Sequence, residues 1–279
     1  MNTVNTTSSS LFFSRTFNLV SSIIINTTKP INIIVWDIGL NKIEKHILNH
    51  YKIKVVKIPE FCKFWRDCYT WKPYVFKISE ERFFLHLDSG NTVLCDIDII
   101  FQIIKEKGYF FVDQGQSLSQ IAPKEYFSYF GLNPLLNYRV IAAGNIGFDK
   151  NSLELSKVID MTYESSINGM CLGFSKKESS RASTKEFILR DCEVFRHDQT
   201  VLNCCLRSVI PEINILDYSI YSAINRTPNV KIYNHRKISY EFILKNMNFY
   251  KFIIFIYCLF NDSVFYFIMK FRKIIKRLI

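Results

Sequence analysis

Four places in this chain carry polar or charged side chains that could do chemistry. Leu87-Asp88-Ser89-Gly90 puts one carboxylate directly after an apolar segment, and Asp198-Gln199 joins a carboxylate to an amide. Lys72 adds an ammonium group, and Thr6–Ser10 is an unbroken run of hydroxyl side chains. Carboxylates and amides bind hydroxyl groups or a hard cation, and ammonium groups bind phosphate. These residue types therefore point to a phosphate-bearing ligand.

Several other chemistries are disfavoured. The sequence has no G-x-G-x-x-G or Walker loop, which argues against a dinucleotide enzyme and a P-loop NTPase. Its eight cysteines form no C-x-x-C pair, so we expect buried thiols in a reducing compartment rather than a zinc module or a disulfide framework. Residues 1–10 are uncharged and unlike a secretory signal, which predicts a cytoplasmic protein.

Composition sets the remaining bounds. With 279 residues, 48% hydrophobic and 22% charged, the chain is expected to form one large or two small globular domains. The net charge of +11 favours an anionic partner. Five of these charges lie in the tail, on Lys270, Arg272, Lys273, Lys276 and Arg277. The body has no basic stripe interleaved with aromatic residues, so nucleic acid is not the expected partner.

The elements that must position these residues alternate between strand and helix. The hydrophobic pattern predicts strands around Val4 and at 31–36, 52–58, 83–87 and 109–112, and helices at 11–24, 41–49 and 96–107. This rhythm predicts an α/β fold with a mostly parallel sheet. Ligands bind beyond the carboxyl ends of such strands, where Thr6–Ser10, Asp37 and Asp88–Asn91 fall.

Taken together, the residues after the strands resemble those of GT-A fold nucleotide-sugar glycosyltransferases, family 8 in particular. The resemblance covers about residues 1–237. It is carried by Thr6–Ser10, Trp36-Asp37-Ile38-Gly39-Leu40, Lys72 upstream of Leu87-Asp88-Ser89-Gly90, Ala142-Ala143-Gly144-Asn145-Ile146-Gly147-Phe148, Asp198-Gln199-Thr200-Val201-Leu202-Asn203 and His235.

The resemblance implies a Rossmann-like GT-A fold, with a mixed, mostly parallel sheet flanked by helices. It also implies a hexosyltransferase that moves a sugar from a nucleotide-diphosphate donor of the UDP type to a saccharide or lipid-linked acceptor. The implied nucleotide-sugar-binding residues are Thr6, Ser8, Ser10, Lys72, Asp88, Ala143, Gly144 and Asn145. The implied catalytic residues are Asp198 and Gln199, and the implied metal ligands are Asp88 and His235.

The sequence departs from the family in its charge-neutralising groups. The second acid of the family's Asp-x-Asp pair is missing, and the H-x-x-G-x-x-K-P-W signature does not follow His235. Two alternatives stay open: Mn²⁺ or Mg²⁺ held by Asp88 and His235, or direct neutralisation of the diphosphate by Lys72, Arg236 and Lys237. Asp96 and Asp98 are expected to cap a helix or to be solvated. The alternative function is a catalytically weak protein that binds a sugar nucleotide or a glycan.

Residues 246–279 differ in character from the expected catalytic domain, 1–245. Two apolar and aromatic runs, 252–260 and 264–269, are interrupted by Asn261-Asp262-Ser263, which disfavours a membrane-spanning helix. A basic amphipathic helix follows, with Phe271, Ile274, Ile275, Leu278 and Ile279 on one side. The pattern predicts attachment to an anionic membrane surface, peripherally on the cytoplasmic face. The alternative is a C-terminal helix that packs on the domain.

Overall fold

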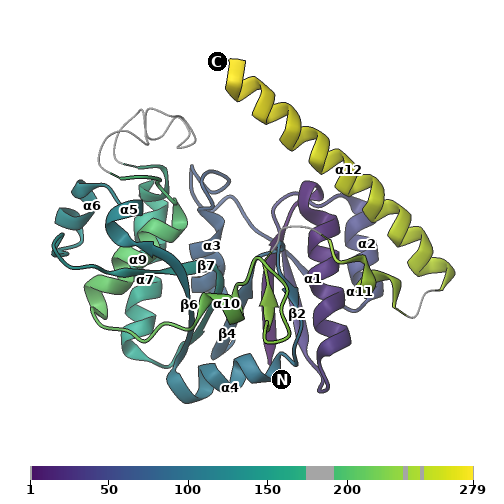
Figure 1. Ribbon diagram of the computed structural model, residues 1–279, viewed down its shortest axis with the longest axis horizontal. Coiled ribbons are helices and arrows are strands. Elements are labelled where there is room, and N and C mark those ends of the chain that lie inside the picture. Colours follow the sequence, from purple (N-terminus) through teal and green to yellow (C-terminus); the bar gives the residue numbers. More distant parts are fainter. Residues whose placement is uncertain (1, 174–191, 235–237, 246–247, 279) are drawn as a thin grey trace. The chain divides into compact units, whose positions relative to one another are not determined.

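The computed structural model describes residues 2–173, 192–234, 238–245 and 248–278 (Figure 1). These residues form two compact units. Unit 1 comprises residues 1–57, 87–99 and 219–279, and unit 2 comprises residues 58–86 and 100–218. The C-terminal segment belongs to unit 1, and the expected division into a catalytic domain and a tail after residue 245 stays a prediction.

Unit 1 is built on three parallel strands in the order β3-β2-β1. They are β1 (Thr3–Ser8), β2 (Asn32–Asp37) and β3 (Lys54–Lys57). Two connecting helices follow the first two strands, α1 (Phe13–Asn26), preceded by the short 3-10 helix η1 (Ser10–Phe12), and α2 (Lys42–His50). Both helices lie within two residues of the predicted bounds. The unit also contains the antiparallel pair β5 (Thr92–Val93) and β8 (Ile232–Tyr233).

The first strand is longer than the sequence analysis expected. Thr6–Ser8 was predicted to belong to a loop, but these residues continue β1 in register with β2, so that Thr6 lies opposite Val35 and Ser8 opposite Asp37. The physical reason is that threonine is β-branched and fits a pleated strand when a neighbouring strand pairs with its backbone. The loop after β1 therefore begins at Ser9.

The C-terminal segment forms α11 (Tyr240–Leu244) and one continuous helix, α12 (Phe249–Leu278). Asn261-Asp262-Ser263 does not interrupt α12, because a helix tolerates polar residues wherever they find partners on one face. Among the described residues, one stretch is long and apolar enough to cross a membrane, Phe249–Lys270 of α12. Its inner side packs against η1, α1 and α11.

Unit 2 contains the strands β4 (Phe83–Leu87), β6 (Tyr109–Ser117) and β7 (Arg139–Asp149), in the order β4-β7-β6 with β6 and β7 antiparallel. The bounds of β4 match the prediction, and β6 begins as predicted but runs five residues further. The longer helices are α3 (Trp71–Ile78), α4 (Asp98–Lys107), α7 (Leu153–Ile167) and α9 (Asp198–Val209). Shorter helices of this unit are α5 (Leu118–Ile121), α6 (Lys124–Tyr129) and η2 (Met170–Leu172), whereas α10 (Tyr218–Tyr221) lies almost wholly in unit 1.

Candidate functional site

The carboxyl ends of the three parallel strands of unit 1 meet at one edge. Ser8 at the end of β1 lies opposite Asp37 at the end of β2, and Asp37 lies opposite Lys57 at the end of β3. This is the edge at which α/β folds bind ligands. The loops after β1 and β2 continue from it.

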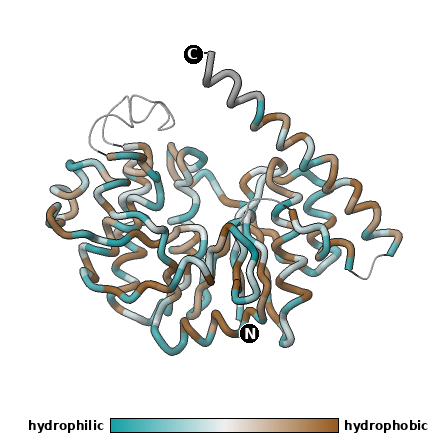
Figure 2. The backbone as a smooth tube through the Cα atoms, viewed as in Figure 1, coloured by the Kyte–Doolittle hydropathy of each residue, from teal (hydrophilic) through white to brown (hydrophobic). Residues whose placement is uncertain are grey.

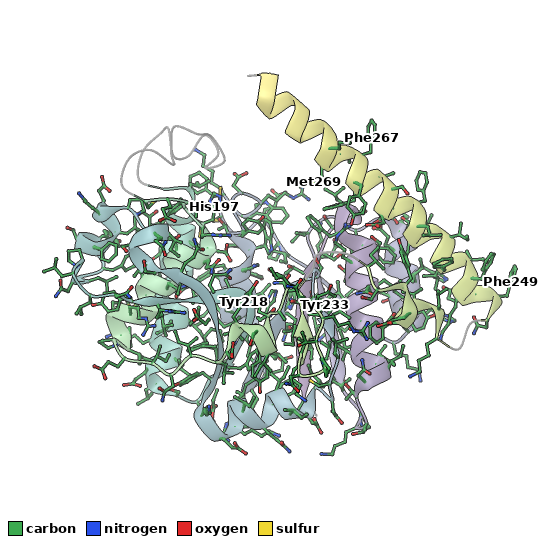
Figure 3. All side chains as sticks on the ribbon, in the orientation of Figure 1. His197, Tyr218, Tyr233, Phe249, Phe267 and Met269 are labelled. Atoms are coloured by element: carbon green, nitrogen blue, oxygen red, sulfur yellow. The ribbon has the colours of Figure 1, made fainter. Side chains whose placement is uncertain are left out.

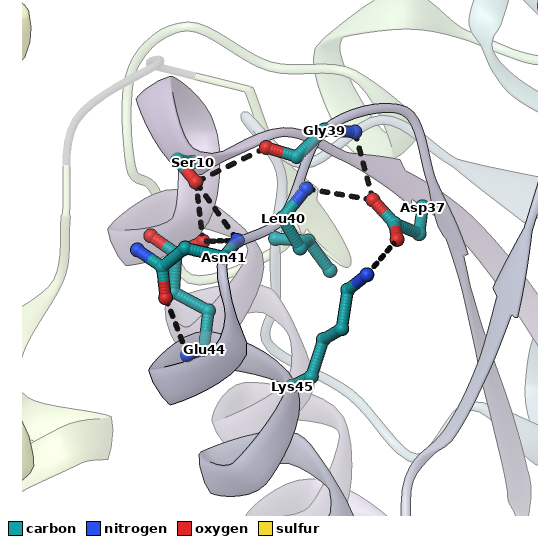
Figure 4. A network of polar contacts seen from close by, with 7 residues as sticks. All are labelled: Ser10, Asp37, Gly39, Leu40, Asn41, Glu44 and Lys45. Atoms are coloured by element: carbon teal, nitrogen blue, oxygen red, sulfur yellow. Dashed lines mark hydrogen bonds and ion pairs between the residues drawn. The ribbon is translucent and has the colours of Figure 1, made fainter.

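Asp37 organises the turn after β2 (Figure 4). Its Oδ1 accepts hydrogen bonds from the backbone N–H groups of Gly39 and Leu40, at 2.7 and 2.6 Å, and its Oδ2 lies 2.6 Å from Lys45 Nζ. Burial raises the pKa of Asp37, but the Lys45 hydrogen bond and the two backbone N–H groups outweigh burial and leave the pKa below its usual value. Asp37 is therefore a structural anion that shapes this turn.

The loop after β1 is tied to the start of α2 (Figure 4). Ser10 Oγ donates to Glu44 Oε2 at 2.6 Å, and Glu44 in turn completes a capping box with Asn41. Ser10 Oγ also accepts from the Asn41 backbone N–H at 3.1 Å. The predicted donor-binding hydroxyl of Ser10 thus already links two loops, which fixes their shape.

Thr6 and Ser8 point towards α1. Ser8 Oγ accepts a 2.7 Å hydrogen bond from Thr16 Oγ1 of α1, and side chains two residues apart on a strand share a face. Both residues are buried, and Thr6 has no exposed surface. A contact of Thr6 or Ser8 with a nucleotide stays a prediction, and the more accessible part of this loop is Ser9 and Ser10, which are half-buried.

Asp88 lies directly after β4, as predicted, and starts a tight turn in which its carbonyl oxygen accepts from the backbone and the side chain of Asn91. Asp96 is a helix cap, as expected: its Oδ1 accepts from the Asp98 backbone N–H, and its Oδ2 accepts from Thr28. Asp98 is paired with Lys29 at 2.9 Å. The contacts of Asp96 and Asp98 are thus with the start of α4, Thr28 and Lys29, and they give no indication that either residue replaces the second acid of the Asp-x-Asp pair.

The described residues do not by themselves form a metal site. Three or more His, Cys, Asp or Glu side chains gather nowhere in the part of the chain that the structure describes. The second predicted ligand, His235, lies outside the described residues, as do Arg236 and Lys237. Asp88 supplies one carboxylate, so Mn²⁺ or Mg²⁺, which take about six oxygen or nitrogen atoms, would need further ligands from donor phosphates, water or residues outside the described part of the chain.

In unit 2, the structure brings Lys72 and Asp198 together. Lys72 lies on α3, Asp198 is the first residue of α9, and Lys72 Nζ is 3.5 Å from Asp198 Oδ2. Their side chains are only 7% and 6% exposed. Lys72 Nζ also lies 5.4 Å from the centre of the Tyr69 ring. Two opposite charges held so far from water are costly to desolvate, so each depends on the other.

Gln199 and Asn203 attach α9 to β7. Gln199 Nε2 donates to the Ile141 carbonyl oxygen at 3.0 Å, and Asn203 Nδ2 donates to the same oxygen at 3.0 Å. Asn203 Oδ1 accepts from the Ile141 backbone N–H at 2.8 Å. These contacts occupy the amide nitrogen of Gln199 and fix the side chain, so its amide oxygen has a defined position.

The strand β7 is irregular at Ala142-Ala143-Gly144-Asn145. Ile141 pairs with Asp113 of β6 and Ile146 pairs with Phe111, so four residues of β7 face one residue of β6. Such a bulge re-aims side chains and is common beside active sites. It starts immediately after Ile141, the residue held by Gln199 and Asn203. The predicted residues Ala143, Gly144 and Asn145 therefore lie in the bulge, next to the contact with Gln199.

Two further residues of this region were not predicted from the sequence as site residues. Tyr69 and His197 both have a positive φ, of 62° and 53°, which is rare for a residue other than glycine and costs about 1–3 kcal/mol. Their ring centres are 6.1 Å apart, and His197 immediately precedes Asp198. Burial lowers the pKa of His197, although a contact with the Cys171 carbonyl oxygen opposes this. Backbone strain carries no sequence signal that could have revealed them.

The thiols near Asp198 are unsuited to act as nucleophiles. Burial, assisted by Asp67 and Asp198, raises the pKa of Cys68 to about 11. Burial also raises the pKa of Cys171. With these raised pKa values, both thiols are almost wholly neutral at physiological pH. The reactive form of cysteine is the thiolate, so neither thiol is suited to act as a nucleophile. The charged candidates of this region remain Lys72 and Asp198.

Comparisons with known proteins identify the fold. No family model and no curated protein matches the sequence. The apo structure of WbbM, a bifunctional glycosyltransferase, matches with a TM-score of 0.56 and 12% identity over 93% of this chain and 44% of the WbbM chain. The chain thus spans less than half of WbbM. Apo mouse xyloside xylosyltransferase 1 matches with a TM-score of 0.50 and 12% identity, over 84% of this chain and 96% of its own.

These matches confirm the fold expected from the sequence. The chain has the GT-A glycosyltransferase fold, with a mixed sheet flanked by helices and an additional apolar helix at its C-terminal end. At 12% identity the likeness defines the fold, and the activity has to be argued from the residues.

Proposed function

We propose that the protein is a glycosyltransferase that moves a sugar from a nucleoside-diphosphate donor of the UDP type to a saccharide or lipid-linked acceptor. The observation that carries the proposal is the buried Lys72–Asp198 pair at the start of α9, next to the bulge of β7, in a chain with the GT-A fold. A protein without a polar ligand gains little from such a pair, because desolvation offsets its attraction.

In the proposed reaction, the bond between the anomeric carbon and the diphosphate oxygen breaks. The diphosphate leaves with the electron pair of that bond, the acceptor hydroxyl oxygen bonds to the same carbon, and the hydroxyl proton passes to the departing diphosphate or to water. Asp198 would accept hydrogen bonds from hydroxyl groups of the donor sugar, and Lys72 would keep this carboxylate ionised. The amide oxygen of Gln199 would accept a further sugar hydroxyl. Small residues in the bulge, Ala143 and Gly144, would allow close approach of the sugar.

The nucleotide is proposed to bind unit 1 residues at the carboxyl ends of its strands. Ser10 and Asp88 are the candidates on the more accessible part of this edge, with Thr6 and Ser8 behind them. The departing diphosphate needs positive charge, either from a divalent cation at Asp88 and His235 or directly from Lys72, Arg236 and Lys237. Donor hydrolysis measured with EDTA, Mg²⁺ or Mn²⁺ separates these two alternatives.

The test of the function is turnover of nucleotide sugars by the purified full chain. We expect Asp198→Asn and Gln199→Ala to lower kcat at least about a hundredfold, because misplacing a reacting sugar costs that much. Asp160→Asn is the matched control, since Asp160 forms an exposed pair with Lys77 in the same unit. Equal activity of Asp198→Asn and Asp160→Asn would overturn the assignment of the site.

The alternative is a sugar-nucleotide or glycan-binding protein with little activity, which the single carboxylate at Asp88 favours. A donor that raises the melting temperature without being hydrolysed or transferred to any acceptor would support this alternative. Asp88→Ala should weaken donor binding in either case.

We also propose that the protein works peripherally on the cytoplasmic face of a membrane, with anionic lipid as its partner. The apolar length of α12 and the five basic residues between Lys270 and Arg277 support this proposal. A membrane-bound enzyme would have ready access to a lipid-linked acceptor.

A further inference from the structure

The helix α12 has a buried side that belongs to unit 1. Ile254, Cys258 and Asp262, spaced four residues apart, are all buried. They form one stripe along the helix, which faces η1, α1 and α11. This half of α12 is a core element of unit 1.

Polar contacts fix this buried side in place. Arg15 of α1, whose side chain is 2% exposed, lies 2.9 Å from Asp262, and its guanidinium carbon is 3.5 Å from the centre of the Phe265 ring. Asn261 Nδ2 donates to the Ser10 carbonyl oxygen at 2.7 Å. Tyr257 Oη donates to Glu44 at 3.0 Å. Removing α12 from unit 1 would leave Arg15 and Glu44 buried without these partners.

The opposite side of α12 is exposed and apolar. Figure 3 shows Phe249 and Phe267 projecting away from α1, and hydrophobic positions recur along the helix in Figure 2. Phe260 and Phe267 are 69% and 71% exposed. The exposed large side chains on this side are Phe249, Phe252, Ile253, Ile256, Phe260, Val264 and Phe267. A contiguous apolar surface of this kind marks a binding surface.

We propose that this side of α12, from Phe249 to Phe267, is the surface that docks on lipid, with the helix lying along the membrane rather than crossing it. The proposal rests on the membrane localisation proposed above and identifies the surface responsible. In the sequence, the same three- and four-residue spacing continues through Phe271, Ile274 and Leu278, which belong to the apolar stripe expected for the tail.

The charge of the following residues favours an anionic lipid surface over a second copy of the chain as the partner. In the sequence, the apolar stretch is followed directly by five basic residues, from Lys270 to Arg277, with no acidic residue among them. Anionic headgroups neutralise such a cluster, whereas a second copy aligned in parallel would bring ten like charges together. Crossing the bilayer is disfavoured because Asn261 and Asp262 would enter its centre and lose their contacts with unit 1.

The experiment uses the full chain and vesicles of phosphatidylcholine alone or mixed equally with phosphatidylglycerol. Wild-type protein should sediment with the anionic vesicles, be partly released by salt and be extracted by alkaline carbonate. Phe260→Glu/Phe267→Glu should weaken this binding at least about tenfold, because two large apolar contacts are replaced by repelled charges. The control is Leu135→Glu/Leu153→Glu, which changes two leucines of unit 2 that are 91% and 88% exposed.

Unchanged binding of the Phe260→Glu/Phe267→Glu variant would overturn the proposal. So would resistance of the wild type to carbonate, which indicates a crossing helix. A lipid-free wild-type dimer that the same variant converts to a monomer would assign the surface to a second copy instead. Hydrolysis of a soluble donor without lipid should be equal in all these proteins, so a failure of the proposed catalytic function is distinguishable from a failure of lipid docking.

Discussion

Lys72 and Asp198 carry opposite charges in a part of unit 2 that water hardly reaches. Their separation of 3.5 Å is close enough for a strong attraction at low dielectric. Replacing one partner leaves the other charge buried without it, whereas replacing both removes the desolvation cost as well. The pair is therefore a sensitive point for stability as well as for the proposed activity.

We predict that Lys72→Met lowers the free energy of unfolding by about 3 kcal/mol, the usual cost of breaking a buried ion pair. The double variant Lys72→Met/Asp198→Asn should recover much of this loss but remain inactive. Urea unfolding at neutral pH measures both. Lys77→Met on the same helix is the control, because the Lys77–Asp160 pair is about 40% exposed on each side and should matter little. Equal losses for Lys72→Met and Lys77→Met would contradict the prediction.

Asp37 makes the stability of the folded protein depend on pH in the acidic range. Its pKa in the folded state lies below its usual value, because the Lys45 contact and two N–H donors outweigh the effect of burial. The stabilisation is therefore present above the unfolded pKa of about 4 and is lost as the pH falls through the folded value. We predict that Asp37→Asn is less stable than wild type at pH 7 and that the difference shrinks below pH 4. Thermal melts across pH 2–7 measure it, and a constant difference would refute it.

At the scale of elements, the position of α9 against β7 depends on Asn203. This side chain donates to the Ile141 carbonyl oxygen and accepts from the Ile141 N–H, at the point where the bulge begins. The arrangement holds the start of α9, and with it Asp198, beside the bulge.

We predict that Asn203→Leu costs about 2 kcal/mol of stability, because it leaves the buried Ile141 N–H unpaired. The amide hydrogen of Ile141 should also exchange faster with solvent. Asn151→Leu, at an exposed position of the same unit, serves as the control. If both variants unfold at the same urea concentration, the contacts of Asn203 do not stabilise the packing of α9 against β7.

At the scale of the whole molecule, α12 is part of a folded unit and not a detachable tail. Its buried side covers α1 and reaches the loop after β1 through Asn261 and Ser10. The described part of α12 thus packs on the domain, which was the alternative expected for residues 246–279. Membrane binding by this segment stays a prediction.

We therefore predict that a chain ending at Met247 melts at least about 5 °C below the full-length protein, since a loss of a few kcal/mol shifts the melting temperature by that much. The variant Phe260→Glu/Phe267→Glu keeps the buried side and should melt close to wild type. Differential scanning calorimetry of the three proteins gives the answer. A truncated chain with an unchanged melting temperature would show that α12 adds no stability.

The sequence by itself determined the features that depend on a few neighbouring residues. Local periodicity predicted the alternation of strands and helices and the position of β4. The type of residue at the start of a helix predicted the capping role of Asp96. The order of short motifs was enough to suggest the GT-A fold. The strands, helices and turns among these features depend on the side-chain periodicity of neighbouring residues.

Only the tertiary structure decided the features that depend on pairing across the chain. Thr6–Ser8 became strand because β2 lies beside it, and Lys72 met Asp198 because α3 and α9 pack in one unit. The bulge of β7 and the two sides of α12 arose in the same way. These features depend on how distant segments pair in register and bury one another's side chains. A local sequence pattern shows which residues are apolar, but it does not show which segment will cover them.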